Sequence, residues 1–281
     1  MRVLTVLVAA AATLVVVAVV TVLVATALWN RTTERVKAEL EIGSRAPEGL
    51  TGLDTASTPP MVARYLSRAL PAGVEPVGMA TLVQEGTFQM GKGDAGWKPF
   101  HATQHVRAYP PGFLWDASIG MMPLIPVRVR DGYLDGAGMM KGAVACLITV
   151  VEAAPTRELA EGSLYRYLAE AVWMPSRLLP GDGLSWDVVD DSTARATLRD
   201  GDVEVSVLFG FDAAGDIVSM LVPERGREVD GEHVPTPWKG RVWDHQVVGG
   251  YRVPLQGEVA WVVDGVEVPY WRGRITSATY R

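Results

Sequence analysis

The stretch Tyr251–Thr279, YRVPLQGEVAWVVDGVEVPYWRGRITSAT, decides the fold because it contains two strand-like segments joined by a tight turn. The segments Tyr251–Val263 and Glu267–Thr279 contain many Val and Trp residues, which favour β-strands. Asp264-Gly265 lies between them, and this dipeptide is typical of a hairpin turn. Hairpin connections make neighbouring strands antiparallel. This end of the chain therefore predicts an antiparallel sheet.

The same succession of short strand-like runs and turn signals extends backwards over most of the chain. The other predicted strands are Thr81–Met90, Lys98–Tyr109, Phe113–Ile119, Ile125–Arg130, Tyr133–Met140, Gly142–Val151, Leu184–Val189, Ala194–Arg199, Val203–Phe211, Ile217–Pro223 and Gly240–Val247. Gly142–Val151 is a continuous apolar run with β-branched residues, which favours a buried strand. A sheet of about a dozen strands must curl, close or fold into two layers.

Two segments with helical spacing interrupt the strands. Pro60–Leu70 has apolar residues on one face and prolines suited to a helix start. Arg157–Leu179 carries an apolar stripe, and Pro175 within it predicts a kink or a break. A helix with one broad apolar stripe needs a concave apolar face to cover. Residues 60–281 are therefore predicted to form an α+β domain, mainly antiparallel β: a half-barrel sheet with helices packed on its concave face.

The first thirty residues have a different character. Val3–Leu28 contains no charged side chain, and as a helix it would be about 39 Å long, more than the hydrocarbon core of about 30 Å. Trp29 follows, where an interfacial aromatic residue belongs. Ala25-Thr26-Ala27 would suit a signal-peptide cleavage site, but the apolar run exceeds the usual length of about 7–15 residues. We therefore expect residues 1–30 to be an uncleaved, single-pass anchor whose residues 3–28 contact the bilayer.

Residues 31–59 are predicted to be a juxtamembrane segment and linker. Glu34–Glu41 alternates in charge, which would allow the anchor helix to extend, and Gly43–Pro60 is rich in Gly, Ser, Thr and Pro. Basic residues flank the apolar run on both sides. Counted literally, they favour a cytoplasmic domain or are close to neutral, although long domains cross membranes largely regardless of such charges.

The overall composition excludes several classes of function. The formal net charge is −6, so the chain offers no basic surface that would bind nucleic acid. Cys146 is the single cysteine and lies in an apolar setting, where it is expected to be a small buried residue rather than a nucleophile. HExxH, CxxC, P-loop and GxGxxG motifs are absent from the sequence, so neither a metal nor a cofactor is predicted.

Few residues have a pattern that suggests catalysis. His101 and His105 share one face of a predicted strand, and simple closure of the following hairpin would place His105 near Asp116. No Ser or Cys in a nucleophile setting accompanies the pair, which favours a solvated strand face. Arg166 and Glu170 are helical neighbours and are expected to form a surface or buried ion pair, with a catalytic carboxylate at Glu170 less favoured. No catalytic residue is therefore predicted.

Aromatic and sulfur-containing residues gather around the predicted Arg157–Leu179 helix and its flanking strands. Flexible Met beside Trp is typical of adaptable apolar sites. The residues predicted to bind a ligand are Trp115, Met139, Tyr167, Glu170, Trp173, Met174 and Trp186. Ordinary core packing is the alternative explanation, and a void between these side chains would distinguish the two.

Two segments carry a resemblance to a known family. Pro110–Ala117 (PPGFLWDA) and Arg166–Pro175 (RYLAEAVWMP) resemble an uncharacterised bacterial family whose members have a short N-terminal membrane segment and one domain of unknown function. The succession of strands is also similar to the LolA-like lipoprotein-carrier half-barrel, in which a curved antiparallel sheet holds an apolar cavity covered by helices. The second likeness concerns architecture, and fold alone does not determine function. These resemblances favour an extracytoplasmic location of the domain.

The sequence therefore leads us to expect a membrane-anchored, non-enzymatic domain that binds a lipid or another apolar ligand in a cavity between sheet and helix. A module for protein–protein interaction in the cell envelope is the alternative. A hydrolase that uses His105, Asp116 or Glu170 is less favoured, because those groups would have to converge in one cleft.

Overall fold

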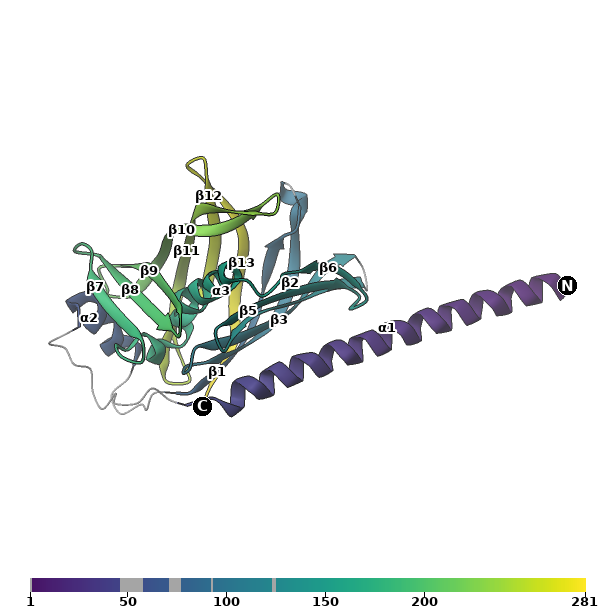
Figure 1. Cartoon of the computed structure of the whole chain (residues 1–281), viewed down its shortest axis with the longest axis horizontal. Helices are drawn as coiled ribbons and strands as arrows, with labels where there is room; N and C mark the ends of the chain where they lie inside the picture. Colours follow the sequence, from purple (N-terminus) through teal and green to yellow (C-terminus); the bar gives the residue numbers. More distant parts are fainter. Residues whose placement is uncertain (1, 46–57, 71–76, 92, 123–124) are drawn as a thin grey trace.

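The computed structural model of the chain describes residues 2–45, 58–70, 77–91, 93–122 and 125–281 (Figure 1). Over these ranges its main part is one antiparallel sheet of 13 strands. The strands are β1 (Met79–Gln89), β2 (Trp97–Arg107), β3 (Gly112–Met122), β4 (Ile125–Leu134), β5 (Ala137–Val144), β6 (Ile148–Glu152), β7 (Leu184–Val188), β8 (Thr193–Asp200), β9 (Val203–Phe211), β10 (Ile217–Val229), β11 (Glu232–Val248), β12 (Tyr251–Val263) and β13 (Val266–Tyr280). A short 3-10 helix, η1 (Asp94–Gly96), precedes β2.

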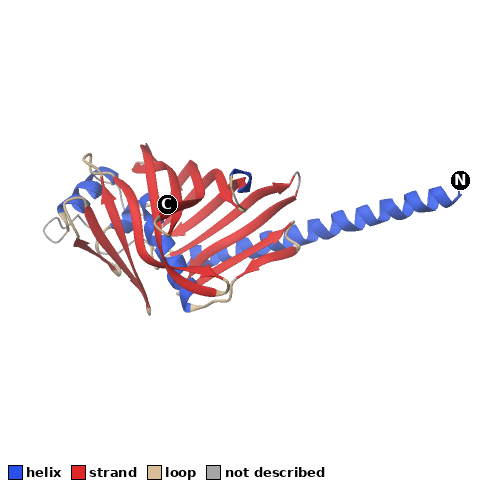
Figure 2. Ribbon diagram, turned by 90° about the horizontal axis from the view of Figure 1, so that it is seen from above, coloured by secondary structure: helices blue, strands red, loops and turns tan. Residues whose placement is uncertain are grey.

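The order of the strands produces an open, curved sheet. β1 to β6 lie side by side in sequence order, so the chain moves outward to an edge at β6. α3 (Arg157–Glu170) and the 3-10 helices η2 (Ala171–Trp173) and η3 (Pro175–Leu178) then cross to β7, the other edge. β7 to β13 return in order until β13 pairs with β1. The sheet is therefore not closed, and the predicted α+β half-barrel is confirmed (Figure 2).

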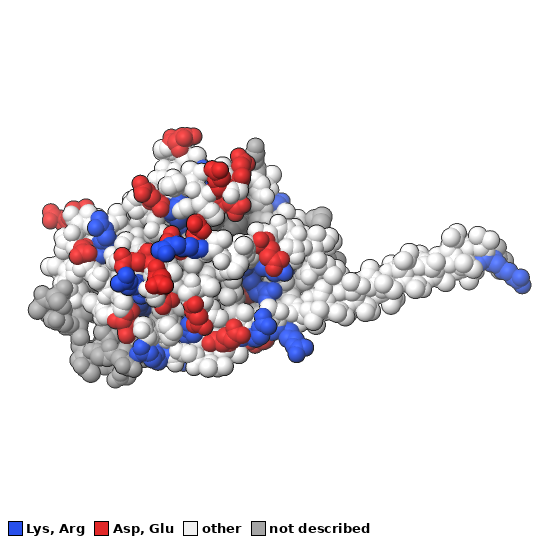
Figure 3. Space-filling model, in the orientation of Figure 1, with Lys and Arg blue, Asp and Glu red and all other residues white. Residues whose placement is uncertain are grey.

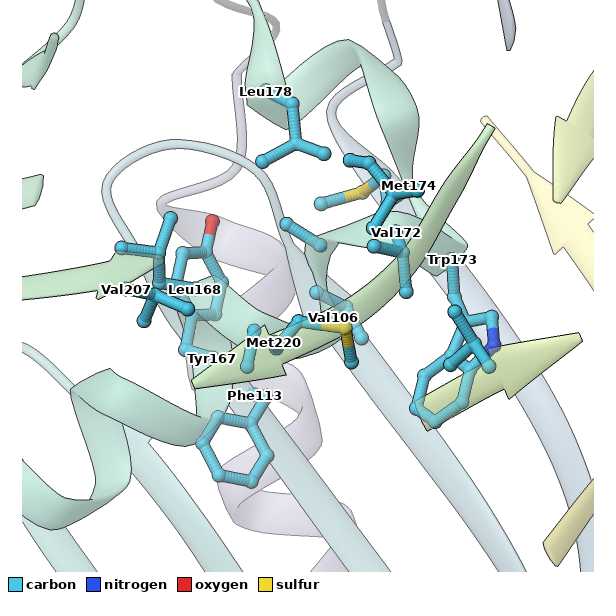
Figure 4. Close-up of a cluster of buried hydrophobic side chains, with 14 of the residues drawn as sticks. Val106, Phe113, Tyr167, Leu168, Val172, Trp173, Met174, Leu178, Val207 and Met220 are labelled. Atoms are coloured by element: carbon cyan, nitrogen blue, oxygen red, sulfur yellow. The ribbon is translucent and has the colours of Figure 1, made fainter. Parts of the chain in front are cut away.

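α3 lies on the concave face between the two halves of the sheet. It contacts β4 and β5 on one side and β9 and β10 on the other. Figure 4 shows Tyr167 and Leu168 of α3 among buried side chains from both halves, including Phe113 of β3 and Val207 of β9. In β9 buried and less buried residues alternate, as expected for a strand with one face on the core. α2 (Pro60–Ala69), the predicted first helix of the domain, packs on β8, β12 and η3.

α1 is one helix from Arg2 to Ile42, and its two parts have different surroundings. The first part is exposed, and the helix is long and apolar enough to span a membrane or to act as a signal anchor. The second part packs on the convex face of the sheet through Trp29, Thr33, Val36 and Leu40, which recur every three or four residues. The expected helical extension over Glu34–Glu41 is thus confirmed, whereas most of the predicted linker, residues 46–57, lies outside the described residues.

Leu40 shows how the second part of α1 is attached. It is fully buried in a cluster with Val36 and with Leu114 of β3, and Met139 of β5 packs against this cluster. Leu114 points to the opposite side of β3 from Trp115, which faces the concave side, because neighbouring side chains alternate along a strand. The helix therefore continues directly onto the outer surface of the domain.

Gly142–Val151 is not one buried strand, so this sequence-based prediction was wrong. β5 ends at Val144, and the chain reverses through Ala145 and Cys146, which have φ values of 49° and 60°. β6 then pairs with β5 and is exposed along its whole length. A continuous run of apolar residues does not reveal a chain reversal, nor does it tell whether a strand is exposed. The apolar run was therefore assigned to a single buried strand. Cys146, expected to be buried, is partly exposed in this turn.

Two strand ends also differ from the predicted ones. Asp131-Gly132 is not a turn, because β4 continues to Leu134 and its turn carries Asp135 with φ of 50°. The β10–β11 hairpin extends to a turn around Asp230, well beyond the predicted strands. These strand boundaries depend on strand pairing and packing more than on local sequence. The break predicted at Pro175 is confirmed: after α3 ends at Glu170 the chain continues through η2, and it leaves helical geometry at Met174 (φ −138°, ψ 72°), directly before η3 begins at Pro175.

Candidate ligand-binding site

A cavity of about 420 Å³ lies between α3 and the concave face of the sheet. Its volume falls in the range of about 300–1,000 Å³ that is usual for ligand pockets. Side chains from both halves of the sheet and from α3 line it: Phe88, Met90, Trp115, Ile119, Val127, Val129, Asp131, Met140, Val150, Val151, Arg166, Glu170, Arg225, Trp238, Val259, Trp261, Tyr270 and Trp271. Fourteen of these 18 are apolar or aromatic, so the walls suit an apolar ligand.

The aromatic side of the cavity comes from β10–β13 and is held in place by its own contacts. The Trp238 indole N–H donates to the Tyr270 hydroxyl at 2.9 Å. The Trp261 ring stacks on Tyr270, with ring centroids 6.3 Å apart, and Phe88 meets Tyr270 edge-on at 5.8 Å. Because the Trp238 N–H already has an acceptor, the Trp238 ring can contact an apolar ligand without leaving that buried donor unpaired.

The opposite side of the cavity carries a buried ion-pair network on α3. The Arg166 guanidinium donates to Glu170 at 2.7 Å and to Asp131 at 2.5 Å. It also lies over the rings of Phe113 and Trp115, at 5.0 and 5.1 Å from their centroids. Burial alone would lower the pKa of Arg166, but the charges of Glu170 and Asp131 outweigh it and raise that pKa above its usual value. Arg166 is thus a buried cation held between the carboxylates of Asp131 and Glu170.

Hydrogen bonds continue from Glu170 across the sheet. Gln104 donates to the second Glu170 oxygen at 2.6 Å, and Gln84 donates to Gln104 at 2.7 Å. The Trp115 indole N–H donates to Gln84 at 2.8 Å. Every member of this buried chain has a partner, which is the condition under which a buried polar network adds rigidity. The network therefore fixes the orientation of the Trp115 ring at the cavity wall.

Arg225 of β10 is the charged residue of the cavity that differs from the others. One guanidinium nitrogen donates to the Gly162 carbonyl at 2.7 Å, and the group lies over Trp238 and Trp261 at 4.6 and 5.6 Å. Its Nε is buried without a hydrogen-bond partner, and within the described part of the chain no carboxylate forms an ion pair with it. Arg225 therefore presents an unneutralised positive charge at the cavity wall.

The structure places the predicted ligand-binding residues in three locations. Trp115 and Glu170 line the cavity. Met139 lies beneath α1 on the convex side. The remaining four, Tyr167, Trp173, Met174 and Trp186, are buried in the core beyond the cavity. The Tyr167 hydroxyl lies within hydrogen-bond distance of the Arg107 and Ala108 carbonyls. Figure 4 shows Tyr167, Trp173 and Met174 packed with other apolar side chains.

The residues considered for catalysis do not meet in one cleft. His105 and Asp116 both lie on the convex face, but they are not opposite each other. In the register of β2 and β3, His105 lies opposite Leu114 and Asp116 lies opposite Thr103. His105 contacts Thr81, while Asp116 binds Arg128 at 2.8 Å. Glu170 lies on the concave side of the same sheet. Among the residues that the structure describes, no group of three or more His, Cys, Asp or Glu side chains is placed to hold a metal ion.

Most of the cavity wall formed by β10–β13 was missed by sequence reasoning. Trp238, Trp261, Tyr270 and Arg225 lie far along the chain from the helix around which aromatic residues were noted. One signal was available: Val259 and Trp261 are two residues apart in a clear strand and so share a face. Arg225 gave no such signal, because a charged residue in a strand resembles a surface position.

The fold and the cavity define an open antiparallel half-barrel with a helix-covered apolar cavity and a long apolar N-terminal helix. The chain belongs to a family of unknown function, DUF6920, which matches residues 56–280. The expectation of a family without an assigned function, drawn from Pro110–Ala117 and Arg166–Pro175, is thus confirmed. No curated protein matches the chain.

Two solved structures are similar to this chain. A LolA superfamily protein from Nitrosomonas europaea has 11% sequence identity and a TM-score of 0.33, over 79% of this chain and 92% of that one. A beta-barrel-like protein of the DUF1849 family from Brucella abortus has 9% identity and a TM-score of 0.23, over 73% of this chain and 98% of that one.

Removing the carboxylate of Glu170 is expected to destabilise the domain. Glu170→Ala leaves Arg166 buried with one anion fewer and frees the Gln104 amide, which should reduce the free energy of unfolding by about 2–4 kcal/mol. Glu161→Ala is the matched control, because Glu161 pairs with Arg157 at the same spacing on the same helix but in an exposed position. It should cost less than about 0.5 kcal/mol. Urea unfolding followed by Trp fluorescence measures both; equal effects would contradict a structural role of the network.

Proposed function

We propose that this protein is a membrane-anchored, non-enzymatic binding protein that holds a lipid in the cavity beneath α3. The observation that carries the proposal is the cavity itself. It has a volume of about 420 Å³, is lined mainly by apolar and aromatic side chains, and lies on the 13-stranded sheet. Apolar lining of this extent favours a ligand that gains free energy by leaving water. The fixed Arg166 network adds rigidity at one side rather than a reactive group.

Arg225 favours an amphipathic ligand with an anionic group over a purely apolar one. An unneutralised guanidinium beside two Trp rings is costly to leave without an anion, and Arg binds carboxylate and phosphate oxygens in a bidentate way. A fatty acid or an anionic phospholipid would place its acid oxygens at Arg225 and its chain along the apolar walls. The carboxylates Asp131 and Glu170 do not compete, since Arg166 already binds both.

The membrane anchor supports the lipid as ligand. α1 has the length and composition of a single membrane-spanning helix, and the cavity-bearing domain is attached directly to its second half. We propose that the domain lies on the extracytoplasmic side, as expected from the sequence. A bilayer next to the domain would then be the source of the ligand.

One observation favours the second candidate function, a protein–protein interaction module of the envelope. β6 is an edge strand that exposes Ile148 and Val150 by 66% and 55%. Exposed apolar edge strands commonly pair with another chain. The cavity does not require such a partner, so ligand binding remains the leading proposal.

Filling the cavity should abolish lipid binding without unfolding the domain. Val259 lines the cavity and is only partly buried, so Val259→Trp adds volume where space exists. Native mass spectrometry of the full chain purified in detergent should show wild type with one bound lipid per molecule, and the variant with at least tenfold lower occupancy. Extraction and mass analysis identify the lipid.

Val262→Trp is the matched control for that experiment. This variant introduces the same Trp side chain on the other face of β12 and should retain the wild-type lipid occupancy. Comparing the two variants also corrects for lipid carried over by the detergent micelle. A wild-type protein that is free of lipid, or equal occupancy in all three proteins, would refute the proposed function.

Loss of the Arg225 charge should reduce affinity for anionic ligands selectively. Arg225→Gln is expected to weaken binding of a fluorescent fatty acid about tenfold, or about 1.4 kcal/mol, and to change binding of its methyl ester by less than twofold. Arg227→Gln, two residues along β10 and outside the cavity lining, is the control and should leave both unchanged. Equal losses for acid and ester would show that Arg225 does not hold the anionic group.

The proposed orientation of the domain predicts labelling from outside the cell. With Cys146→Ser as background, Val188→Cys introduces a thiol on the exposed edge strand β7. A membrane-impermeant maleimide added to intact cells should label it as completely as in lysed cells. Labelling only after lysis would place the domain in the cytoplasm.

A further inference from the structure

An exposed apolar surface lies at one end of the domain, on the β5–β6 turn and on β6. Leu147, Ile148, Val150 and Val151 are exposed by 44%, 66%, 55% and 43%. All four belong to a segment of five consecutive residues at a sheet edge. An exposed apolar cluster of this kind is unusual for a domain that faces only water.

The contacts of α1 show which way this end of the domain points. Leu134, at the far end of β4, packs against the buried cluster that contains Val36 and Leu40. The Trp29 ring, by contrast, lies under the Arg130 guanidinium at 4.1 Å. Moving along α1 from Leu40 towards the N-terminus therefore follows β4 from Leu134 towards Ile125. The β5–β6 turn lies at that end, because the Ala145 N–H donates to the Pro126 carbonyl. Figure 1 shows β6 on the side of the domain towards which the free part of α1 extends.

The turn reaches the uncharged part of α1. From Arg130, which contacts Trp29, β4 continues for five residues to Ile125, a length of about 16 Å at about 3.3 Å per residue. Ala25 and Thr26, which precede Trp29 on α1, are partly buried. Val3–Leu28 is about 9 Å longer than a hydrocarbon core of about 30 Å, and its last residues are those beside the domain. Figure 3 shows α1 without charged side chains from near its N-terminal end to the domain. A spanning α1 thus brings the β5–β6 turn to the membrane surface.

The contacts of Trp29 fix the level of the turn relative to α1. Arg31 and Arg35 are exposed on α1 just beyond the apolar run, farther from the hydrocarbon core than the turn. Trp29 is 4% exposed and is held by Arg130 and by Asp116, to whose carboxylate its indole N–H donates at 3.3 Å. The position of the domain along α1 is therefore fixed by a buried contact.

The same exposed surface continues into the cavity. Val150 and Val151 are among the residues that line it, although roughly half of each side chain is exposed. An acyl chain that leaves the bilayer beside β6 would therefore contact the apolar side chains of Val150 and Val151 before it reaches Val127 and Val129 inside the cavity. Charged groups on such a path would impose a desolvation penalty, and none of these four positions carries one.

We infer that β6 and the β5–β6 turn dock into the interfacial layer of the bilayer and form the entrance through which a lipid passes between membrane and cavity. The entrance role rests on the proposed function, whereas docking itself rests on α1 spanning the membrane. The occupant of the exposed surface is thus the membrane surface and not a second protein.

Cys146 makes the inference measurable, because the single native cysteine lies within the β5–β6 turn. The full chain is labelled there with a fluorophore and reconstituted into vesicles of phosphatidylcholine and phosphatidylglycerol that carry nitroxide lipids. Quenching by nitroxides placed high on the acyl chain should exceed, by at least threefold, the quenching of the same label at Val188→Cys in the Cys146→Ser background. Val188 is the matched position, being 58% exposed on the opposite edge strand.

Ile148→Glu should lower the quenching at Cys146 by at least half, and Val188→Glu should leave it unchanged. Thermal unfolding of both variants checks that they fold. Quenching at Cys146 no greater than at Val188, with equal access of aqueous iodide to both, would overturn the inference and leave β6 as an edge for a protein partner.

Lipid occupancy of the same variants separates this inference from the proposed function. Lipid retained in wild type without quenching at Cys146 means that the cavity binds lipid and the docking is wrong. Quenching at Cys146 with an empty cavity means that docking holds and the entrance role is wrong. Slower uptake of a fluorescent fatty acid from vesicles by Ile148→Glu, with unchanged final occupancy, is the result expected if both hold.

Discussion

The antiparallel pairing of β1 with β13 joins the beginning of the domain to its end, and the cavity depends on it. The register runs from Ala80 opposite Tyr280 to Phe88 opposite Trp271. Without this ladder β1–β6 and β7–β13 would be two separate sheets with α3 between them. Because about 190 residues separate the partners, the chain must pay a loop-closure cost before these contacts form. That cost is offset by the buried residues that both halves contribute around α3.

The same long-range pairing explains what sequence reasoning could reach. Hairpins such as Tyr251–Thr279 were predictable, since alternation and turn dipeptides act over a few residues. Tyr167, Trp173 and Met174 were predicted to bind a ligand, with core packing as the other explanation, because composition does not tell whether the space in front of a side chain is filled. The width of that space is set by the distance between two halves whose strands pair at β1 and β13. Trp115 and Glu170 border the remaining void and the others do not.

The attachment of α1 illustrates a signal that was present in the sequence. Trp29, Thr33, Val36 and Leu40 are spaced as one helical stripe, and their burial shows that the stripe serves the domain. Trp29 resembled an interfacial residue because it ends an apolar run. Its actual partner, the Arg130 guanidinium, is about 100 residues away and is not predictable from local pattern. The β6 edge shows the reverse case, where apolar character predicted burial and the structure exposes it.

The unbroken course of α1 from Arg2 to Ile42 has a mechanical consequence. A domain joined to an apolar helix without a break, and packed against that helix at Trp29 and Leu40, has no joint about which to swing relative to the free part of the helix. Held in a membrane in this way, the protein would diffuse within one plane at a constant height.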